Sequence, residues 1–185
     1  MKMYEEQISP VRNKIAVYKT DKRLIEFRDK LNPAFWDNYA ELHGHEDVGN
    51  GKMYSNIGIV LYDYSAGKGN QTIQVYVNVS PEDIMWIQNA LVLGTQNFLL
   101  EQTKIFGIPD QNGYSQMTKL NIIRAERDKN GEIRRYPWNI SAENGIGIAQ
   151  HTAIGGTFCK SGSYKTLRKV YISISDYDFF KLINK

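Results

Sequence analysis

The fold is decided by the segment Val75-Tyr-Val-Asn-Val-Ser-Pro-Glu-Asp-Ile-Met-Trp-Ile87, which predicts a strand that runs directly into a helix. Its three valines alternate with Tyr76 and Asn78, so the strand has one apolar face and one polar, aromatic face. Ser80 stands where an N-cap is needed, and Pro81 suits the first helical position. The helix is therefore expected to begin at Pro81.

The same pattern returns near the end of the chain as Val170-Tyr-Ile-Ser-Ile-Ser-Asp-Tyr-Asp-Phe-Phe-Lys-Leu182. Two copies of one strand-cap-helix unit favour an internal duplication, although valine alternation and serine caps also recur by chance. We expect one domain of residues 1–185, with pseudo-repeats at about 14–102 and 118–185. The positions that match without a gap are Val75 and Val170, Tyr76 and Tyr171, Ser80 and Ser175, and Asp83 and Asp178.

The residues before the first copy predict two strands and a helical segment. Lys14–Lys19 and Met53–Tyr64 alternate in polarity and are expected to be strands, the latter pairing with Thr72–Val79 across a glycine-rich turn. Asp21–Leu31 has apolar residues at helical spacing and ends before Asn-Pro, so it predicts a helix, with Phe35–Leu42 as a further helical turn.

The second half repeats the order of strands followed by a helix. We expect the helix that begins at Pro81 to extend to about Gln102, and Asn130-Gly131 to form a type I′ hairpin turn. Strands followed by a helix, twice, predict an α+β fold with antiparallel sheets rather than alternating β-α-β units. The other predicted elements are a loop at 105–116, strands at Thr118–Arg127, Glu132–Ile140 and Arg168–Ser175, and a helix at Asp176–Asn184.

Positive charge is concentrated in the second half of the chain. Residues 118–185 carry 12 Lys and Arg against 6 Asp and Glu, a balance of +6, while residues 1–117 carry 11 against 14, a balance of −3, which together give the net +3. A basic half points to a polyanionic partner, the alternative being scattered solubilising charge. Cys159 is the only cysteine, and no apolar run approaches a membrane span, so we expect a cytoplasmic protein without membrane contact.

The repeated arrangement of strands and a closing helix, carried by Val75–Ile87 and Val170–Leu182, resembles the whirly-type and PC4-like single-stranded-DNA-binding fold. The likeness concerns the order of elements over roughly 14–185. The Lys-Gly-Lys-Ala-Ala-Leu signature of plant whirly proteins is absent, and only the short turn Ala66-Gly-Lys-Gly69 is similar to it. The resemblance implies binding of single-stranded DNA in transcription, replication or repair, by an oligomer.

Binding of a single strand requires cations along the phosphates and flat aromatic groups on which bases stack. Tyr76 and Tyr171 lie opposite the valine faces of their strands and are expected on the outer sheet surface, unless another layer covers them. The candidate stacking residues are Tyr18, Tyr62, Tyr64, Tyr76, Tyr136, Trp138 and Tyr171. The candidate phosphate-binding residues are Lys68, Lys119, Arg124, Arg134, Arg135, Arg168 and Lys169, with Arg127, Lys160 and Lys165 in the same basic half.

The sequence gives weaker support for a metal site or a phosphate-binding loop than for a nucleic-acid surface. His43-Gly-His-Glu-Asp47 has metal-ligand residue types, but a glycine-bearing loop with only His151 elsewhere is a poor scaffold for a transition metal. The glycine motifs match neither phosphate-loop pattern, and Gly145-Ile-Gly147 is better explained by a strand that bends or approaches another backbone. We expect no cofactor, no metal and no catalysis, and the partner to be single-stranded DNA or RNA. The alternatives are a protein-interaction or assembly module and, more remotely, a small metal-dependent enzyme.

Overall fold

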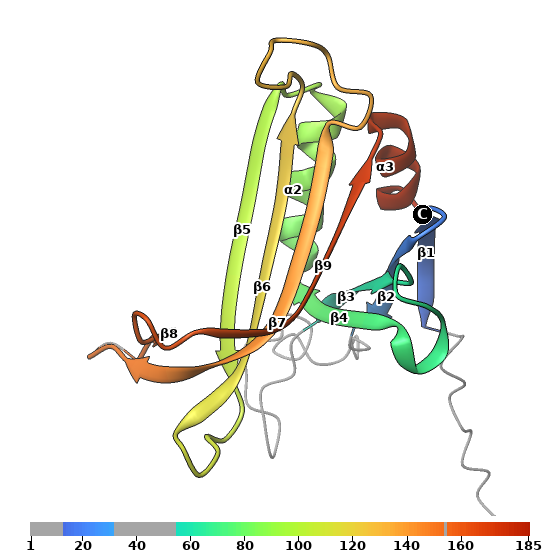
Figure 1. Cartoon of the computed structure of the whole chain (residues 1–185). Coiled ribbons are helices and arrows are strands. Elements are labelled where there is room, and N and C mark those ends of the chain that lie inside the picture. The colour runs from blue at the N-terminus through green and yellow to red at the C-terminus, as the bar shows by residue number, and fades with distance from the viewer. Residues whose placement is uncertain (1–12, 32–54, 154) are drawn as a thin grey trace, which may run out of the picture.

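The computed structural model describes residues 13–31, 55–153 and 155–185, which form two antiparallel β-sheets and two helices (Figure 1). Sheet 1 has the strand order β1-β2-β3-β4, and the helix α2 follows its last strand directly. The elements are β1 (Lys14–Lys19), β2 (Arg23–Lys30), β3 (Asn56–Asp63), the short 3₁₀ turn η1 (Gly69–Gln71), β4 (Ile73–Val79) and α2 (Pro81–Val92).

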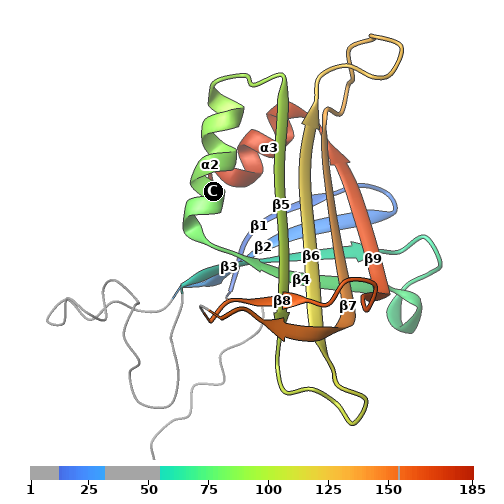
Figure 2. The same ribbon diagram turned by 90° about the vertical axis from the view of Figure 1, so that its left-hand side faces the viewer.

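Sheet 2 has the order β5-β6-β7-β9, and the short strand β8 pairs with the far end of β7. Figure 2 looks onto this sheet, with the strands of sheet 1 running across behind it. The predicted α+β class with antiparallel sheets is confirmed. The elements are β5 (Asn97–Phe106), β6 (Tyr114–Ala125), β7 (Trp138–His151), β8 (Thr157–Cys159), β9 (Lys165–Ile174) and α3 (Asp176–Ile183).

The last two strands of each sheet pair in the same register. Tyr76 on β4 opposes Val60 on β3, and Tyr171 on β9 opposes Ser141 on β7. The two tyrosines therefore hold corresponding places. The pairs that match are Val75–Leu61 with Val170–Ala142, Val77–Ile59 with Ile172–Ile140, and Val79–Ile57 with Ile174–Trp138.

One hydrophobic core lies between the sheets and the helices. Each sheet contributes one face to it, here called the inner face, and the opposite face is called the outer face. Ile87 and Ala90 of α2, with Phe179 and Leu182 of α3, close the core from the helical side. The inner faces contribute Ile25, Phe27, Ile59, Leu61, Val75, Val77 and Val79 from sheet 1, and Phe98, Leu120, Ile122, Trp138, Ile140, Ala142, Val170, Ile172 and Ile174 from sheet 2.

Both strand-to-helix joints have the predicted serine caps. The Ser80 hydroxyl accepts a hydrogen bond from the Asp83 amide at 3.2 Å, and the Asp83 carboxylate accepts one from the Ser80 amide at 3.1 Å. Ser175 accepts from the Asp178 amide at 3.1 Å. The first backbone N–H groups of a helix have no partner within the helix. The serine caps accept hydrogen bonds from these groups and thereby determine where each helix begins.

The predicted helix at Asp21–Leu31 is wrong, because this segment forms β2. Ile25 and Phe27 alternate onto the inner face and are 0% and 4% exposed, while β1 and β3 pair on either side. The spacing of apolar residues in this segment is compatible with a helix and with a strand. The strand forms because its residues pair with two neighbouring strands and are buried there. The predicted helical turn Phe35–Leu42 lies outside the described residues.

The predicted extension of the second helix to Gln102 is also wrong, because α2 ends at Val92 and β5 follows. Gly94 has a φ of 61°, the left-handed conformation that commonly ends a helix. Beyond it, Phe98 and Leu100 alternate toward the core with strand periodicity.

The connection between β6 and β7 is longer than predicted. Gly131 has a φ of 83°, but no described non-glycine residue has positive φ, so Asn130-Gly131 is not a type I′ turn. β7 begins only at Trp138, after a loop at 126–137 that holds a single bridge between Arg127 and Ile133. The predicted strand Glu132–Ile140 is therefore a strand only from Trp138 onward, because β-ladder pairing starts after Pro137, which has no amide to donate.

Candidate nucleic-acid interface

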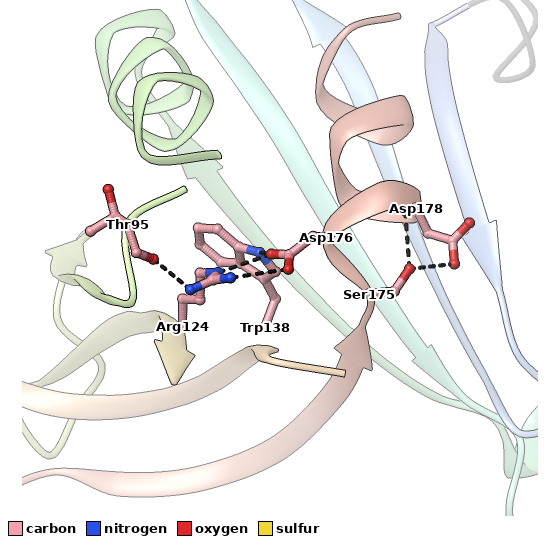
Figure 3. A network of polar contacts seen from close by, with 6 residues as sticks. All are labelled: Thr95, Arg124, Trp138, Ser175, Asp176 and Asp178. Atoms are coloured by element: carbon pink, nitrogen blue, oxygen red, sulfur yellow. Dashed lines mark hydrogen bonds and ion pairs between the residues drawn. The ribbon is translucent and has the colours of Figure 1, made fainter. Parts of the chain in front are cut away.

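Two of the predicted binding residues lie in the interior (Figure 3). Trp138 is 0% exposed and donates its indole N–H to Asp176 at 2.7 Å. Arg124 is 7% exposed, contacts both Asp176 carboxylate oxygens at 2.9 and 3.0 Å, and donates to the Thr95 carbonyl at 2.6 Å. The arginine hydrogen bond holds the pKa of Asp176 below its usual value, with the Trp138 contact acting in the same direction. These contacts connect α3 to sheet 2, and the burial of Trp138 and Arg124 shows that the prediction of both as nucleic-acid contacts is wrong.

Tyr18 lies on the inner side of β1, where it opposes Ile25 and packs against the core. Burial raises the pKa of its phenol, and the nearby Asp178 and Tyr136 add to the rise. Tyr18, predicted as a stacking residue, therefore packs on the core side of sheet 1 and does not share the outer face with Tyr76.

The outer face of sheet 1 carries Tyr62 and Tyr76, beside Tyr64 at the end of β3. The Tyr62 and Tyr64 rings are stacked, with centroids 6.0 Å apart, and the Tyr62 hydroxyl accepts a hydrogen bond from Arg28 at 2.9 Å. The Tyr76 ring lies across Gly58, where an added Cβ would be 3.2 Å from it, and the Lys30 ammonium is 4.4 Å from the ring centroid.

The middle of this face is closed. Glu26 and Val60, which oppose one another on β2 and β3, are 2% and 0% exposed. Lys14 forms an ion pair with Glu26 at 3.0 Å, and Arg28 forms a second one. A carboxylate buried under two cations leaves no flat polar surface for a ligand, so the tyrosines of sheet 1 surround a covered centre.

Four further predicted residues lie in loops, away from the sheet faces. Lys68 is exposed in the β3–β4 hairpin. Arg134, Arg135 and Tyr136 are exposed in the loop 126–137, where the Arg135 guanidinium lies 5.3 Å from the Tyr136 ring. Figures 1 and 2 place this loop and the hairpin at different parts of the molecule, so these residues do not form one surface.

The remaining candidates lie on or beside the outer face of sheet 2. Tyr171 is 45% exposed, and the guanidinium of Arg23, from the start of β2, stacks over its ring at 3.8 Å. The Lys119 ammonium lies 3.7 Å from the ring of Tyr164. Arg168 is exposed, with no ion pair among the described residues.

Lys169 is committed to an ion pair with Glu143 at 2.7 Å. Burial opposes ionisation of Glu143, but hydrogen bonds from Lys169, Tyr164 and Thr166 outweigh it and lower the pKa of the carboxyl. The charge of Glu143 is thus neutralised within the face. Of the three candidate phosphate-binding residues on or beside this face, Lys119 and Arg168 have no ion pair with a carboxylate in the described part of the chain.

The sequence reasoning missed Tyr164 and Arg23. Tyr164 is held flat by Gly145, because an added Cβ there would be 2.4 Å from the Lys165 carbonyl oxygen and 2.8 Å from the ring. The predicted close approach of another backbone is found at Gly145, where the Lys165 carbonyl lies close, but the sequence did not indicate that an aromatic ring would also lie there. Arg23 comes from the other sheet, so nothing near it in sequence indicates its contact with Tyr171.

Asn144 fixes the two sheets relative to one another. Its side-chain amide accepts from the Tyr76 backbone N–H at 3.0 Å and donates to the Tyr76 carbonyl at 2.8 Å. The asparagine thereby imitates a neighbouring strand at the free edge of β4. This contact places the β4 edge against β7.

The described residues hold no group of three or more His, Cys, Asp or Glu side chains arranged to bind a metal ion, and the segment His43–Asp47 lies outside them. Among the described helices, none is long and apolar enough to cross a membrane. Comparison of the chain with protein-family models, with curated proteins and with solved structures gave no match.

Proposed function

We propose that the protein binds single-stranded nucleic acid, DNA or RNA, largely through backbone charge and base stacking. The observation that carries the proposal is the pairing of cations with tyrosines on or beside the outer face of sheet 2: Lys119 with Tyr164, and Arg23, which also forms an ion pair with Asp63, with Tyr171. In each pair the cation lies over the ring, so positive charge for phosphates and flat groups for base stacking occur together, which are the two elements of single-strand recognition. The basic second half of the chain supplies further cations around sheet 2.

The arrangement of the elements supports the same proposal. Four antiparallel strands precede α2, and the same four-strand order precedes α3 with the short strand β8 inserted between its last two strands; the register of the last two strands matches. This is the order that we associate with whirly-type and PC4-like proteins. We propose that the two units arose by duplication and that the protein acts in the cytoplasm, in transcription, replication or repair, without a catalytic step.

The test is titration of a fluorescein-labelled 20-nucleotide single strand at 50 and 200 mM salt, followed by anisotropy. Affinity should fall with salt, and Lys119→Gln should reduce the slope of log K against log salt by about 0.7, the contribution of one phosphate contact. Tyr171→Leu should weaken binding roughly 5- to 150-fold, the range for loss of one stacked base.

Lys181→Gln is the matched control, because Lys181 lies 4.2 Å from the ring of Tyr177 in a similar cation–tyrosine pair, but on α3. It should leave the affinity unchanged. Absence of binding at 50 mM salt, or binding that is indifferent to salt, would exclude the proposed function.

A second candidate function is assembly with other protein chains. Met85, Trp86 and Val92 on α2, with Leu93 at its end, are 61%, 61%, 67% and 79% exposed. Such an exposed apolar surface is typical of a protein contact. If copies of the chain associate here, light scattering after size-exclusion chromatography should give a multiple of 21.3 kDa, and Trp86→Glu should lower it.

A further inference from the structure

The outer face of sheet 2 forms a regular grid of side chains, because paired strands align their outward residues in rows. The middle of the grid holds amides and hydroxyls, chiefly Asn121, Asn139 and Ser141. From β5 to β9 the successive rows are Leu99, Ile123, Asn139 and Ser173; then Glu101, Asn121, Ser141 and Tyr171; then Thr103, Lys119, Glu143 and Lys169.

The centre of this grid is open, unlike the corresponding centre of sheet 1. Asn121 and Ser141 are partly exposed, whereas Glu26 and Val60, which hold the same places in sheet 1, are buried. The side chains of Asn121 and Ser141 make no hydrogen bond to another described residue. Asn139 uses its amide only to donate to Ser173 at 3.2 Å.

The chemistry of the grid suits base edges more than phosphates. An asparagine amide presents a donor and an acceptor side by side, which match the adjacent donor and acceptor of a nucleobase edge. The Tyr171 ring, with the Arg23 guanidinium stacked over it, lies at one side of the grid, and the Lys119–Tyr164 pair lies at the next row, so planar groups suited to base stacking border the amides. With strands about 4.8 Å apart, the distance from β5 to β9 is about 14 Å, and a four-stranded sheet takes two or three bases.

We infer that the outer face of sheet 2 is a base-reading surface, on which Asn121 and Asn139 bind the edges of unstacked nucleobases and give the protein a base preference. This inference rests on the proposed function, but it goes further, because binding through charge and stacking alone is nearly indifferent to sequence. It also assigns the site to sheet 2 and excludes the corresponding face of sheet 1.

The experiment compares labelled 12-nucleotide strands of dA, dC and dT at one salt concentration. Wild-type protein should bind the best strand at least about fivefold more tightly than the worst, the lower end of the discrimination given by one amide–base pair. The Asn121→Ala, Asn139→Ala double variant should compress this difference to below about twofold.

Gln74→Ala is the control, because Gln74 is an exposed amide at the sheet 1 position that corresponds to Lys169. It should keep the full preference. Thermal melting followed by circular dichroism verifies that each variant is folded, and Asn121→Ser with Asn139→Ser should give the same loss of preference if alanine prevents folding.

Equal affinity of the wild type for all strands, or an unchanged preference in the double variant, would overturn the base-reading surface and leave the proposed function standing. A wild type that binds none of the strands would overturn both. The two failures are therefore distinct.

Discussion

Replacement of Asp176 by asparagine should destabilise the protein more than any other neutralisation of a carboxylate in α3. The Asp176 carboxylate receives two hydrogen bonds from Arg124 and one from Trp138. Arg124 and Trp138 are 7% and 0% exposed, so without the negative charge a buried guanidinium is left with neutral acceptors only, the Thr95 carbonyl and the asparagine oxygen. The loss should therefore come mainly from the unpaired arginine.

The magnitude follows from the exposure of each partner. Breaking a fully buried ion pair costs about 3–5 kcal/mol. The Asp176 side chain is 52% exposed, so water replaces part of what is lost. We discount the figure accordingly and expect a decrease in the free energy of unfolding of about 2–3 kcal/mol. For a chain of this length that corresponds to a fall in Tm of roughly 4–12 °C.

Asp178→Asn is the matched control, because Asp178 lies in the same first turn of α3 and interacts equally with the helix dipole. Its only ion pair with a described residue is with the exposed Lys181 at 3.4 Å, and the Ser175 hydroxyl, which donates to it at 2.8 Å, can donate equally to an asparagine oxygen, so its replacement should cost less than about 1 kcal/mol. Urea denaturation followed by far-UV circular dichroism measures both variants.

The effect of Asp176→Asn should also depend on pH. Because the pKa of Asp176 is lowered in the folded state, its contribution is complete above the unfolded value, about 3.9, and is lost as the pH falls through the folded value. The difference between wild type and variant should therefore be full at pH 7 and shrink below about pH 4. Equal losses for Asp176→Asn and Asp178→Asn at pH 7, or a difference that stays constant down to pH 2.5, would refute the assigned role of the pair.

Two further substitutions test how the sheets are joined. Asn144→Ala removes both hydrogen bonds to the Tyr76 backbone and leaves edge groups of β4 unpaired, so urea denaturation should report a loss of about 1–3 kcal/mol, whereas Asn139→Ala should cost less. Gly145→Val would place a Cβ 2.4 Å from the Lys165 carbonyl oxygen, so it should destabilise the protein and expose the amides of β9 to faster hydrogen exchange; unchanged exchange would contradict the close approach at Gly145.

The sequence by itself determined the joints between strands and helices. Ser80 and Ser175 cap their helices through amides only three residues away, so the signal and the structure that it specifies lie in the same short segment. The alternation of Val75, Val77 and Val79 is likewise local, and all three reach the inner face as predicted. The α+β class followed from the order of these local units.

Only the tertiary structure decided where ambiguous segments and isolated polar residues belong. The segment at Arg23–Lys30 has apolar spacing that suits helix and strand, and the flanking strands β1 and β3 settle it. Arg124 and Trp138 are residue types that often bind nucleic acid. In the fold, the β7–β9 register and the start of α3 place Asp176 beside both, and both side chains are buried in contact with it. Such pairings depend on contacts between distant parts of the chain.

For the candidate surface too, the sequence predicted which face a residue lies on but not which residues from other strands lie beside it. The sequence placed Tyr76 and Tyr171 opposite the valines because side chains alternate along a strand. It could not indicate that Tyr76 would border a closed ion-pair cluster while Tyr171 would border an open grid of amides, since each grid is assembled from four strands. Cross-strand register determines which residues become neighbours, and register is a property of the folded sheet.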